Sequence, residues 1–268
     1  MALEFADPQV DGGALMRVVM ALSGGMDSTG LLMRVLADGA KVDCLSYRYG
    51  QKHSIELERA RANIAYLASK GYDVTHRIAD LSSAMGLFHS ALTTDGYAVP
   101  EGHYEEEQMK QTVVPNRNAI FASILYGYAL SVALREDCDV QIALGVHSGD
   151  HAIYPDCRPE FYTSIGEAFA IGNWESERVS FLLPYIDGDK ESILLDTLDA
   201  CDKLGLDFDT VLANTNTSYN PDAQGRASGK SGADVERILA FHAIGRVDPV
   251  EYVEPWEVVL KNALELNA

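Results

Sequence analysis

A short run of small and hydroxylated residues near the start of the chain has the types and spacing that phosphate chemistry needs. The run follows an apolar segment, residues 18–22, precedes an amphipathic stretch from Leu31, and reads Ser23-Gly24-Gly25-Met26-Asp27-Ser28. A strand that turns at glycines into a helix directs unpaired backbone N–H groups toward an anion. The two glycines also let the backbone approach a phosphate without a Cβ atom in the way. We therefore predict a phosphate-binding loop.

Two common nucleotide-binding patterns do not match this run. No lysine follows the glycines, as GxxxxGK[ST] requires, and the spacing is not GxGxxG. The run instead resembles SGGxDS, the signature of the PP-loop ATP pyrophosphatases, which cleave ATP between the α- and β-phosphates and hold the pyrophosphate on this loop. The alternative is an ordinary serine-glycine turn before a helix, which the six matching positions disfavour. The resemblance implies an ATP site that includes Leu22, Ser23, Gly24, Gly25, Met26, Asp27 and Ser28.

The surrounding apolar pattern alternates short strands with longer helices, which predicts βαβ units and a parallel sheet. The predicted strands cover residues 18–22, 42–47, 74–78, 140–145 and 179–184, and the helices lie near 54–69, 117–134, 159–171 and from Lys190. Ligands bind at the carboxyl ends of such strands, so the polar segments 23–28, 47–53 and 145–158 are expected to form one cleft. Residues 80–112 break the rhythm, either as a lid over the site or as a disordered surface loop.

The composition limits the classes of partner. The 268 residues are 47% hydrophobic and carry 40 acidic against 21 basic side chains, for a net charge of −19. This charge argues against nonspecific nucleic-acid binding and against an anionic membrane surface, and no apolar run approaches the ~20 residues of a membrane span. The acidic start lacks the basic segment of a secretory signal, and the four scattered cysteines indicate reduced thiols. We expect a cytoplasmic protein.

Four further segments resemble the 7-cyano-7-deazaguanine synthases. Residues 49–56 carry their YGQxHxxE pattern, residues 114–118 read VPNRN where they have VPxRN, residues 154–161 read YPDCRPEF, and residues 184–193 match a later lysine segment. The resemblance implies that ATP adenylates 7-carboxy-7-deazaguanine, that ammonia then gives an amide, and that a second ATP yields the nitrile. It also implies ATP and Mg²⁺ as cofactors, and a homodimer, because the family is commonly dimeric.

Adenylation places a polyanionic phosphate chain beside a carboxylate, so cations must neutralise the charge. Arg117, Lys190 and a Mg²⁺ ion held near Asp27 are predicted to supply this neutralisation. Tyr47 and Gly145 complete the predicted ATP site. The predicted catalytic residues are Ser23, Asp27, Ser28, Arg117 and Lys190.

The implied substrate is a flat, guanine-like base that carries a carboxylate. Arg158 is predicted to clamp the carboxylate with its planar guanidinium, with a surface ion pair as the alternative. Asp150 or Asp156 is expected to accept hydrogen bonds from the base edge. A tyrosine is expected to stack on the base, although Tyr47 suits the protein core equally well. The predicted substrate site is Tyr49, Gln51, His53, Asn118, Asp150, Tyr154, Asp156 and Arg158.

One part of the resemblance breaks down near the C-terminus. The family has four cysteines there that bind a structural zinc, in part as ACGKCxxC, whereas residues 227–234 read ASGKSGAD. Ser228, Ser231 and Asp234 stand at cysteine positions, as does Ser218 or Tyr219 before them. Neutral hydroxyls do not replace thiolates as zinc ligands, so we predict no structural zinc.

The predicted fold class is α/β. A flexible leader is expected over residues 1–16. An open parallel-sheet, Rossmann-like domain of the adenine nucleotide alpha hydrolase (PP-loop) type is expected over residues 17–205. A small helical subdomain that contains the degenerate zinc region is expected over residues 206–268.

Four hypotheses for the function follow from these patterns. The first is a carbon–nitrogen ligase that converts the deazaguanine carboxylate to the nitrile. The second keeps the adenylating core but joins the activated base, as an amide, to another amine in a protein or a nucleotide. The third is a sulfur-inserting or amidotransferring enzyme that acts on tRNA, which the net charge of −19 disfavours. The fourth is a catalytically silent nucleotide-binding module, which the intact loop, Arg117 and Lys190 disfavour.

Overall fold

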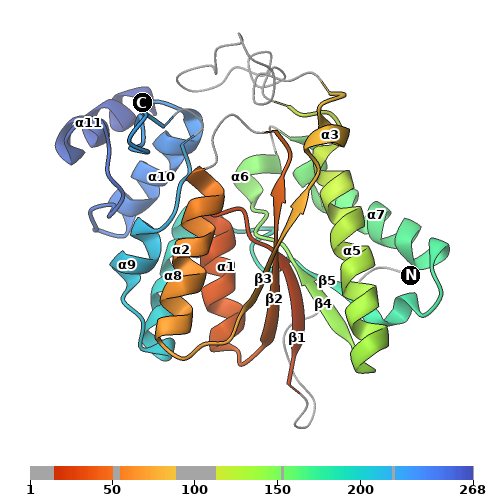
Figure 1. Ribbon diagram of the computed structural model, residues 1–268. Helices are drawn as coiled ribbons and strands as arrows, with labels where there is room; N and C mark the ends of the chain where they lie inside the picture. Colours follow the sequence, from red (N-terminus) through yellow and green to blue (C-terminus); the bar gives the residue numbers. More distant parts are fainter. Residues whose placement is uncertain (1–14, 51–54, 89–112, 152–153, 219–220, 268) are drawn as a thin grey trace.

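Five parallel strands form the centre of the protein, in the order β3-β2-β1-β4-β5 (Figure 1). The computed structural model describes residues 15–50, 55–88, 113–151, 154–218 and 221–267. The strands are β1 (Arg17–Ala21), β2 (Lys41–Arg48), β3 (Thr75–Asp80), β4 (Val140–Ala143) and β5 (Val179–Leu182). The predicted α/β class with a parallel sheet is confirmed, although β4 ends before the predicted residues 144 and 145, which belong to the following loop.

Helices cover both faces of the sheet (Figure 1). One layer contains α1 (Met26–Ala37), α2 (Ile55–Ser69) and α8 (Lys190–Leu204), and the other contains α5 (Arg117–Glu136) and α7 (Pro159–Gly172). Successive side chains of a strand point to opposite faces. Accordingly, Val18 and Met20 join the core with α1 and α8, whereas Val19 joins the core with α5. Burial on both faces explains why the central strand β1 is apolar after Arg17, whereas the edge strand β3 is polar and partly exposed.

The remaining elements are short or C-terminal. They are α3 (Ser82–Met85), α6 (Ser148–His151), two 3₁₀ turns (Pro155–Cys157 and Ser176–Arg178), α9 (Phe208–Ala213), α10 (Gly232–Ala243) and α11 (Trp256–Leu266). Phe208 of α9 and Phe241 of α10 belong to the main core, so these helices pack on the sheet domain. The division at residue 205 stays a prediction. The predicted leader up to residue 14 and most of the excursion, residues 89–112, lie outside the described residues.

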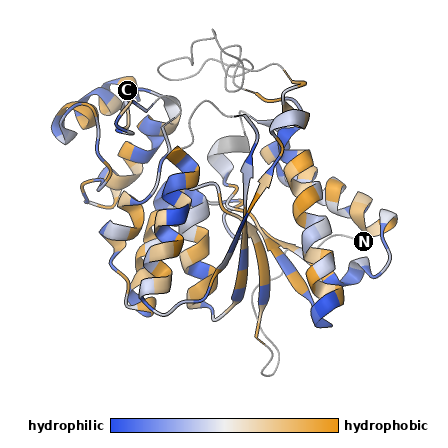
Figure 2. Ribbon diagram, viewed as in Figure 1, coloured by the Kyte–Doolittle hydropathy of each residue, from blue (hydrophilic) through white to orange (hydrophobic). Residues whose placement is uncertain are grey.

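Helix α5 corrects the expectation that no segment suits a membrane span. It is 20 residues long and, among the residues that the structure describes, alone is long and apolar enough to cross a bilayer by length and composition. Part of this helix is buried, because Leu125, Ala129 and Val132 pack into the core against the sheet. Figure 2 shows hydrophobic residues along the strands and along much of α5.

The strand order creates a crevice beside β1. The chain runs outward from β1 to β2 and β3, and then returns to pair β4 with the other edge of β1. The loops after β1 and β4 therefore diverge at a switch point, where open α/β sheets bind ligands. A Cβ atom on Gly145 would lie 3.1 Å from the backbone of Asp27. The predicted proximity of segments 23–28 and 145–158 is thus present in the fold.

Candidate active site

The glycine loop between β1 and α1 is held by its own hydroxyl groups. The Oγ atoms of Ser23 and Ser28 lie 2.9 Å apart, and the N–H of Gly25 donates to Ser23 Oγ at 3.2 Å. Gly24 has a φ of +90°, and a Cβ atom there would lie 2.0 Å from the carbonyl oxygen of Glu56. Only glycine therefore fits where the loop crosses the first turn of α2.

This loop offers backbone rather than side-chain atoms to a ligand. The side chains of Leu22 and Met26 are fully buried in the core, so any contact that they make to ATP comes from the main chain. Helix α1 begins at Met26. The first N–H groups of a helix have no carbonyl partners within it, and its N-terminus carries a partial positive charge. This combination suits a phosphate.

Asp27, in the first turn of α1, meets the ammonium group of Lys190. Their atoms lie 3.1 Å apart, and Lys190 Nζ is also 3.0 Å from Nε2 of His147 and 3.5 Å from Glu236. Lys190 opens α8, where Asp189 forms a capping box with Ser192 that fixes the start of the helix. Four distant segments of the chain thus place one cation at the glycine loop.

Burial and charge act in opposite directions on Asp27. Desolvation favours the neutral acid, but the charge and hydrogen bond of Lys190, helped by His147, outweigh it and hold the pKa of Asp27 below its ordinary value. One oxygen, Oδ2, contacts Lys190, whereas the buried Oδ1 has no hydrogen-bond partner within the described part of the chain. The carboxylate therefore stays ionised at neutral pH with one oxygen unpaired in the described region.

A second charged group lies beside the loop, where Glu56 faces Arg117. Burial raises the pKa of Glu56 to about 7, and Arg117 opposes that shift only in part. Burial also raises the pKa of Tyr49, despite a hydrogen bond with Arg117. Arg117 begins α5, so the carboxyl-end loop of β2 and the starts of α2 and α5 meet next to the glycine loop.

The segments predicted to bind the substrate are only partly described. Asn118 donates to the sulfur of Cys157 at 3.7 Å, which joins the 114–118 and 154–158 segments. Tyr154 is half-buried, and Asp156 and Arg158 reach the surface to increasing degrees. The structure does not describe Gln51 and His53 or the side chain of Asp150.

Tyr47 packs inside the protein. Its side chain is buried, its ring stacks on Phe121 with centroids 4.1 Å apart, and its hydroxyl donates to the carbonyl of Phe121 at 2.9 Å. Tyr49 contacts the same ring edge-on, with centroids 5.4 Å apart. Of the two predictions for Tyr47, the geometry therefore favours a place in the core, and Tyr49 is the better placed of the pair for a ligand.

Comparison with known proteins decides the family. The model of the family described as "Queuosine biosynthesis protein QueC" matches residues 17–245. The chain belongs to this family. The 7-cyano-7-deazaguanine synthase 1 of Colwellia psychrerythraea is 43% identical over 236 residues, which is 88% of this chain and 98% of that protein. The 7-cyano-7-deazaguanine synthase of Alteromonas mediterranea is 44% identical over 235 residues, with the same coverage of 88% and 98%.

A solved structure resembles this family member more loosely. NMN synthetase from Francisella tularensis is 11% identical, with a TM-score of 0.38 over 94% of this chain and 86% of that chain. Such a score is too low to carry an argument about this protein.

Three residues of the site of this QueC family member were not predicted from its sequence. His147 lies in the loop after β4, within segment 145–158 that the strand-end rule placed at the cleft, although it was not among the predicted site residues. Glu236 reaches Lys190 from α10, and the N–H of Asn216 donates to the carbonyl of Gly24 at 2.9 Å. The last two come from the C-terminal segment, whose return to the sheet leaves no local signal in the sequence.

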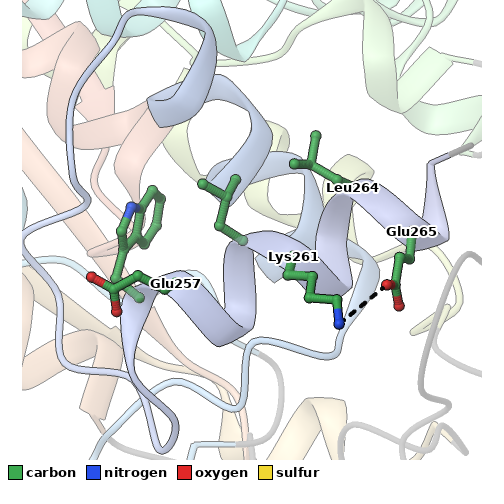
Figure 3. A pocket seen from close by; sticks show the side chains of 6 residues that line it. Glu257, Lys261, Leu264 and Glu265 are labelled. Atoms are coloured by element: carbon green, nitrogen blue, oxygen red, sulfur yellow. Dashed lines mark ion pairs between the residues drawn. The ribbon is translucent and has the colours of Figure 1, made fainter.

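A surface pocket lies apart from this site. It follows one side of α11 and is lined by Trp256, Glu257, Leu260, Lys261, Leu264 and Glu265 (Figure 3). Lys261 and Glu265 form an exposed ion pair at 3.7 Å within it. None of these residues belongs to the predicted ATP or substrate site, so the pocket is not assigned to the reaction.

Proposed function

We propose that the protein is a 7-cyano-7-deazaguanine synthase, an ATP-dependent carbon–nitrogen ligase that converts 7-carboxy-7-deazaguanine and ammonia to the nitrile. The observation that carries the proposal is the nearly buried ammonium group of Lys190, held by Asp27 and His147 where the glycine loop enters α1. The curated relatives that share this chain over most of its length bear the synthase name. A cation fixed beside a phosphate-binding loop suits the transfer of an adenylyl group.

In the first step, a carboxylate oxygen of the substrate attacks the α-phosphorus of ATP, and the bond from that phosphorus to the bridging oxygen of pyrophosphate breaks. The products are an acyl adenylate and pyrophosphate. Pyrophosphate gains negative charge as it leaves, so donors placed where that charge develops lower the barrier. The N–H groups at the start of α1 and the cation of Lys190 are the proposed donors, with Ser23 and Ser28 holding the loop in shape.

A divalent cation fits the same place. The buried Oδ1 of Asp27 has no partner in the described part of the chain, and a carboxylate oxygen is a ligand that Mg²⁺ prefers. When bound there, Mg²⁺ supplies charge neutralisation to the phosphates of ATP. The chain itself contributes Asp27 in its ionised state, which Lys190 and His147 maintain by lowering its pKa.

The second half of the reaction removes oxygen from the substrate. Ammonia attacks the activated carbonyl carbon, AMP leaves with one of the original carboxylate oxygens, and a proton is released to give the amide. The amide oxygen then attacks a second ATP, and AMP departs with that oxygen while two protons leave the nitrogen. Two AMP and two pyrophosphate molecules are formed for each nitrile, and each AMP carries one carboxylate oxygen.

The substrate would lie against the loops that follow β2 and β4. Arg158 is proposed to bind the carboxylate with its planar guanidinium, and Tyr49 to contact the flat base. Asn118, Tyr154, Asp156 and Asp150 are proposed neighbours of the base, along with Gln51 and His53. The join between Asn118 and Cys157 supports this placement, because it brings the segments that carry most of these residues together.

The experiment combines the protein with ATP, Mg²⁺ and 7-carboxy-7-deazaguanine labelled with ¹⁸O in its carboxylate, with and without ammonium. Mass spectrometry is expected to show nitrile and labelled AMP only when ammonium is present. Asp27→Ala should abolish AMP release, whereas Asp38→Ala, at the exposed end of the same helix, should not. A deazaguanine mass added to a protein or nucleotide would instead support amide transfer to another amine, and no AMP under any condition would refute the proposal.

A further inference from the structure

The zinc that the family resemblance implies does not fit the residues present here. The positions that match its cysteine ligands carry Ser228, Ser231, Asp234 and, before them, Ser218 or Tyr219, and Ser218 is the one that contacts Asp234. Structural zinc sites use thiolates and imidazoles in a tetrahedral set, and a neutral hydroxyl is a poor substitute. Three hydroxyls and one carboxylate therefore make an oxygen donor set that disfavours zinc.

These four residues nevertheless converge, because one carboxylate oxygen joins them. Oδ2 of Asp234 accepts from Ser228 Oγ at 2.8 Å, from Ser218 Oγ at 3.0 Å and from the N–H of Ser231 at 3.3 Å. In return, the N–H of Asp234 donates to Ser231 Oγ at 3.2 Å. Asp234 is 1% exposed. We call Ser218, Ser228, Ser231 and Asp234 the Asp234 cluster.

Burying a carboxylate costs free energy unless other groups stabilise its charge. The position of Asp234 at the start of α10 provides such groups. Ser231 caps α10 and Asp234 occupies the third position of that helix, so the two form a capping box. Negative charge is favourable in the first turn of a helix. Two hydroxyl donors and one backbone donor replace water at Oδ2, whereas the buried Oδ1 has no hydrogen-bond partner within the described residues.

The Asp234 cluster is connected to the glycine loop through a short chain of hydrogen bonds. The side chain of Ser218 is held by Asp234, and the backbone carbonyl of Ser218 accepts a hydrogen bond from the side-chain Nδ2 of Asn216 at 3.0 Å. The backbone N–H of Asn216 donates to the carbonyl of Gly24 at 2.9 Å. The cluster thus supports one side of the loop, while α2 supports the other at Glu56.

We propose that the carboxylate of Asp234 replaces a structural zinc ion by joining residues 216–218 and 227–231 to α10 through hydrogen bonds. Through these segments it positions the glycine loop. Asp234 is a positioning residue in this scheme and touches no substrate. The structural part of the proposal is independent of the reaction, whereas its effect on ATP rests on the proposed function. The stability of the fold is therefore expected not to change when a zinc chelator is added.

Metal content and thermal unfolding test the structural part. Elemental mass spectrometry is expected to find far less than one zinc per chain after purification without chelator, and 1,10-phenanthroline should leave the melting temperature unchanged. Asp234→Asn keeps the shape of the side chain but removes the negative charge of the group that accepts three hydrogen bonds. It should lower the melting temperature by about 5–10 °C. The matched control is Asp207→Asn, because Asp207 caps α9 from an exposed position. This substitution should lower the melting temperature much less than Asp234→Asn. One zinc per chain, or loss of stability with chelator, would overturn the proposal.

Direct titration of ATP tests the positioning part without requiring turnover. At a temperature where Asp234→Asn is folded, its affinity for ATP is expected to fall about tenfold, a loss that Asp207→Asn should not share. Ser218→Ala with Ser228→Ala removes two donors to the same carboxylate and should weaken ATP binding in the same direction. Unchanged affinity in all these variants would refute the link to the loop. Lack of nitrile formation by the wild-type protein, with ATP binding intact, would refute only the proposed function.

Discussion

Replacing Gly24 by alanine tests whether the glycine loop must sit where α2 holds it. A Cβ atom at this position would lie 2.0 Å from the carbonyl oxygen of Glu56 and 3.2 Å from the nitrogen of Ala60. The first separation must grow by at least about 1 Å to reach an allowed contact, and both neighbours are backbone atoms of a helix, which cannot rotate away. The loop must therefore move away from α2.

The expected effect on function follows from that displacement. A misplacement of about 1 Å costs on the order of 100-fold in rate for groups that must be aligned. We expect kcat/KM for ATP to fall about 100-fold in Gly24→Ala, which corresponds to about 2.7 kcal/mol of lost transition-state stabilisation. The left-handed backbone at φ +90° adds roughly 1–2 kcal/mol of conformational cost for alanine.

The chain offers a matched control at the other end of α1. Gly39 has a similar φ of +81°, but a Cβ atom there would meet nothing within 4 Å. Gly39→Ala should lose the same conformational energy, seen as a melting temperature a few degrees lower, and keep its kcat/KM. AMP release measured at several ATP concentrations, with circular dichroism to verify folding, gives both quantities. If folded Gly24→Ala keeps its activity within threefold, or if Gly39→Ala loses as much, the steric reasoning is wrong.

Three other substitutions test the charged groups. Lys190→Met removes the cation beside the loop and should lower kcat about 100-fold at saturating ATP, with a change below threefold contradicting its role. Burial raises the pKa of Glu56 to about 7 in the folded protein. As pH rises from about 5 to 7, this carboxyl ionises in the unfolded chain before it ionises in the folded protein, so the wild-type protein loses stability over this range. The melting temperature of Glu56→Gln relative to wild type should therefore rise between about pH 5 and pH 8, and a constant difference would refute the shift. Arg237→Met leaves the fully buried Asp248 without its two-point partner and should cost about 3–5 kcal/mol in urea unfolding, against about 1 kcal/mol or less for the exposed Arg246→Met.

The fold was predictable because local pattern and tertiary structure agree. The apolar run at residues 18–22 and the glycines after it specify a buried strand, a sharp turn and a helix. β1 lies within one residue of that run, and α1 begins at Met26, directly after the glycines. The same rhythm identified the other strands. The rule that ligands bind at strand ends placed segment 23–28, which contains Asp27, at a cleft, and the family resemblance added Lys190 to the same site. Their side-chain atoms lie 3.1 Å apart.

The parts of the site that were not predicted come from segments distant in sequence that fold back against the sheet. Asn216 and Glu236 reach the loop and Lys190 from beyond the last strand, and nothing in their neighbours marks them. The apolar stretch of α5 was underestimated because tyrosines and serines interrupt it, although its total length equals that of a membrane helix. The predicted loss of zinc ligands stays a prediction, but the hydrogen bonds of Asp234 that take their place were visible only in three dimensions.

The position of β1 in the middle of the sheet has a consequence for biosynthesis on the ribosome. β1 emerges first among the strands, yet one of its two edges stays without its partner until β4, more than one hundred residues later, has been made. When β4 has been made, Lys190 and Asn216, which contact Asp27 and Gly24, have not yet been synthesised. The contacts that Lys190 and Asn216 make at the glycine loop can therefore form only after most of the chain has been synthesised.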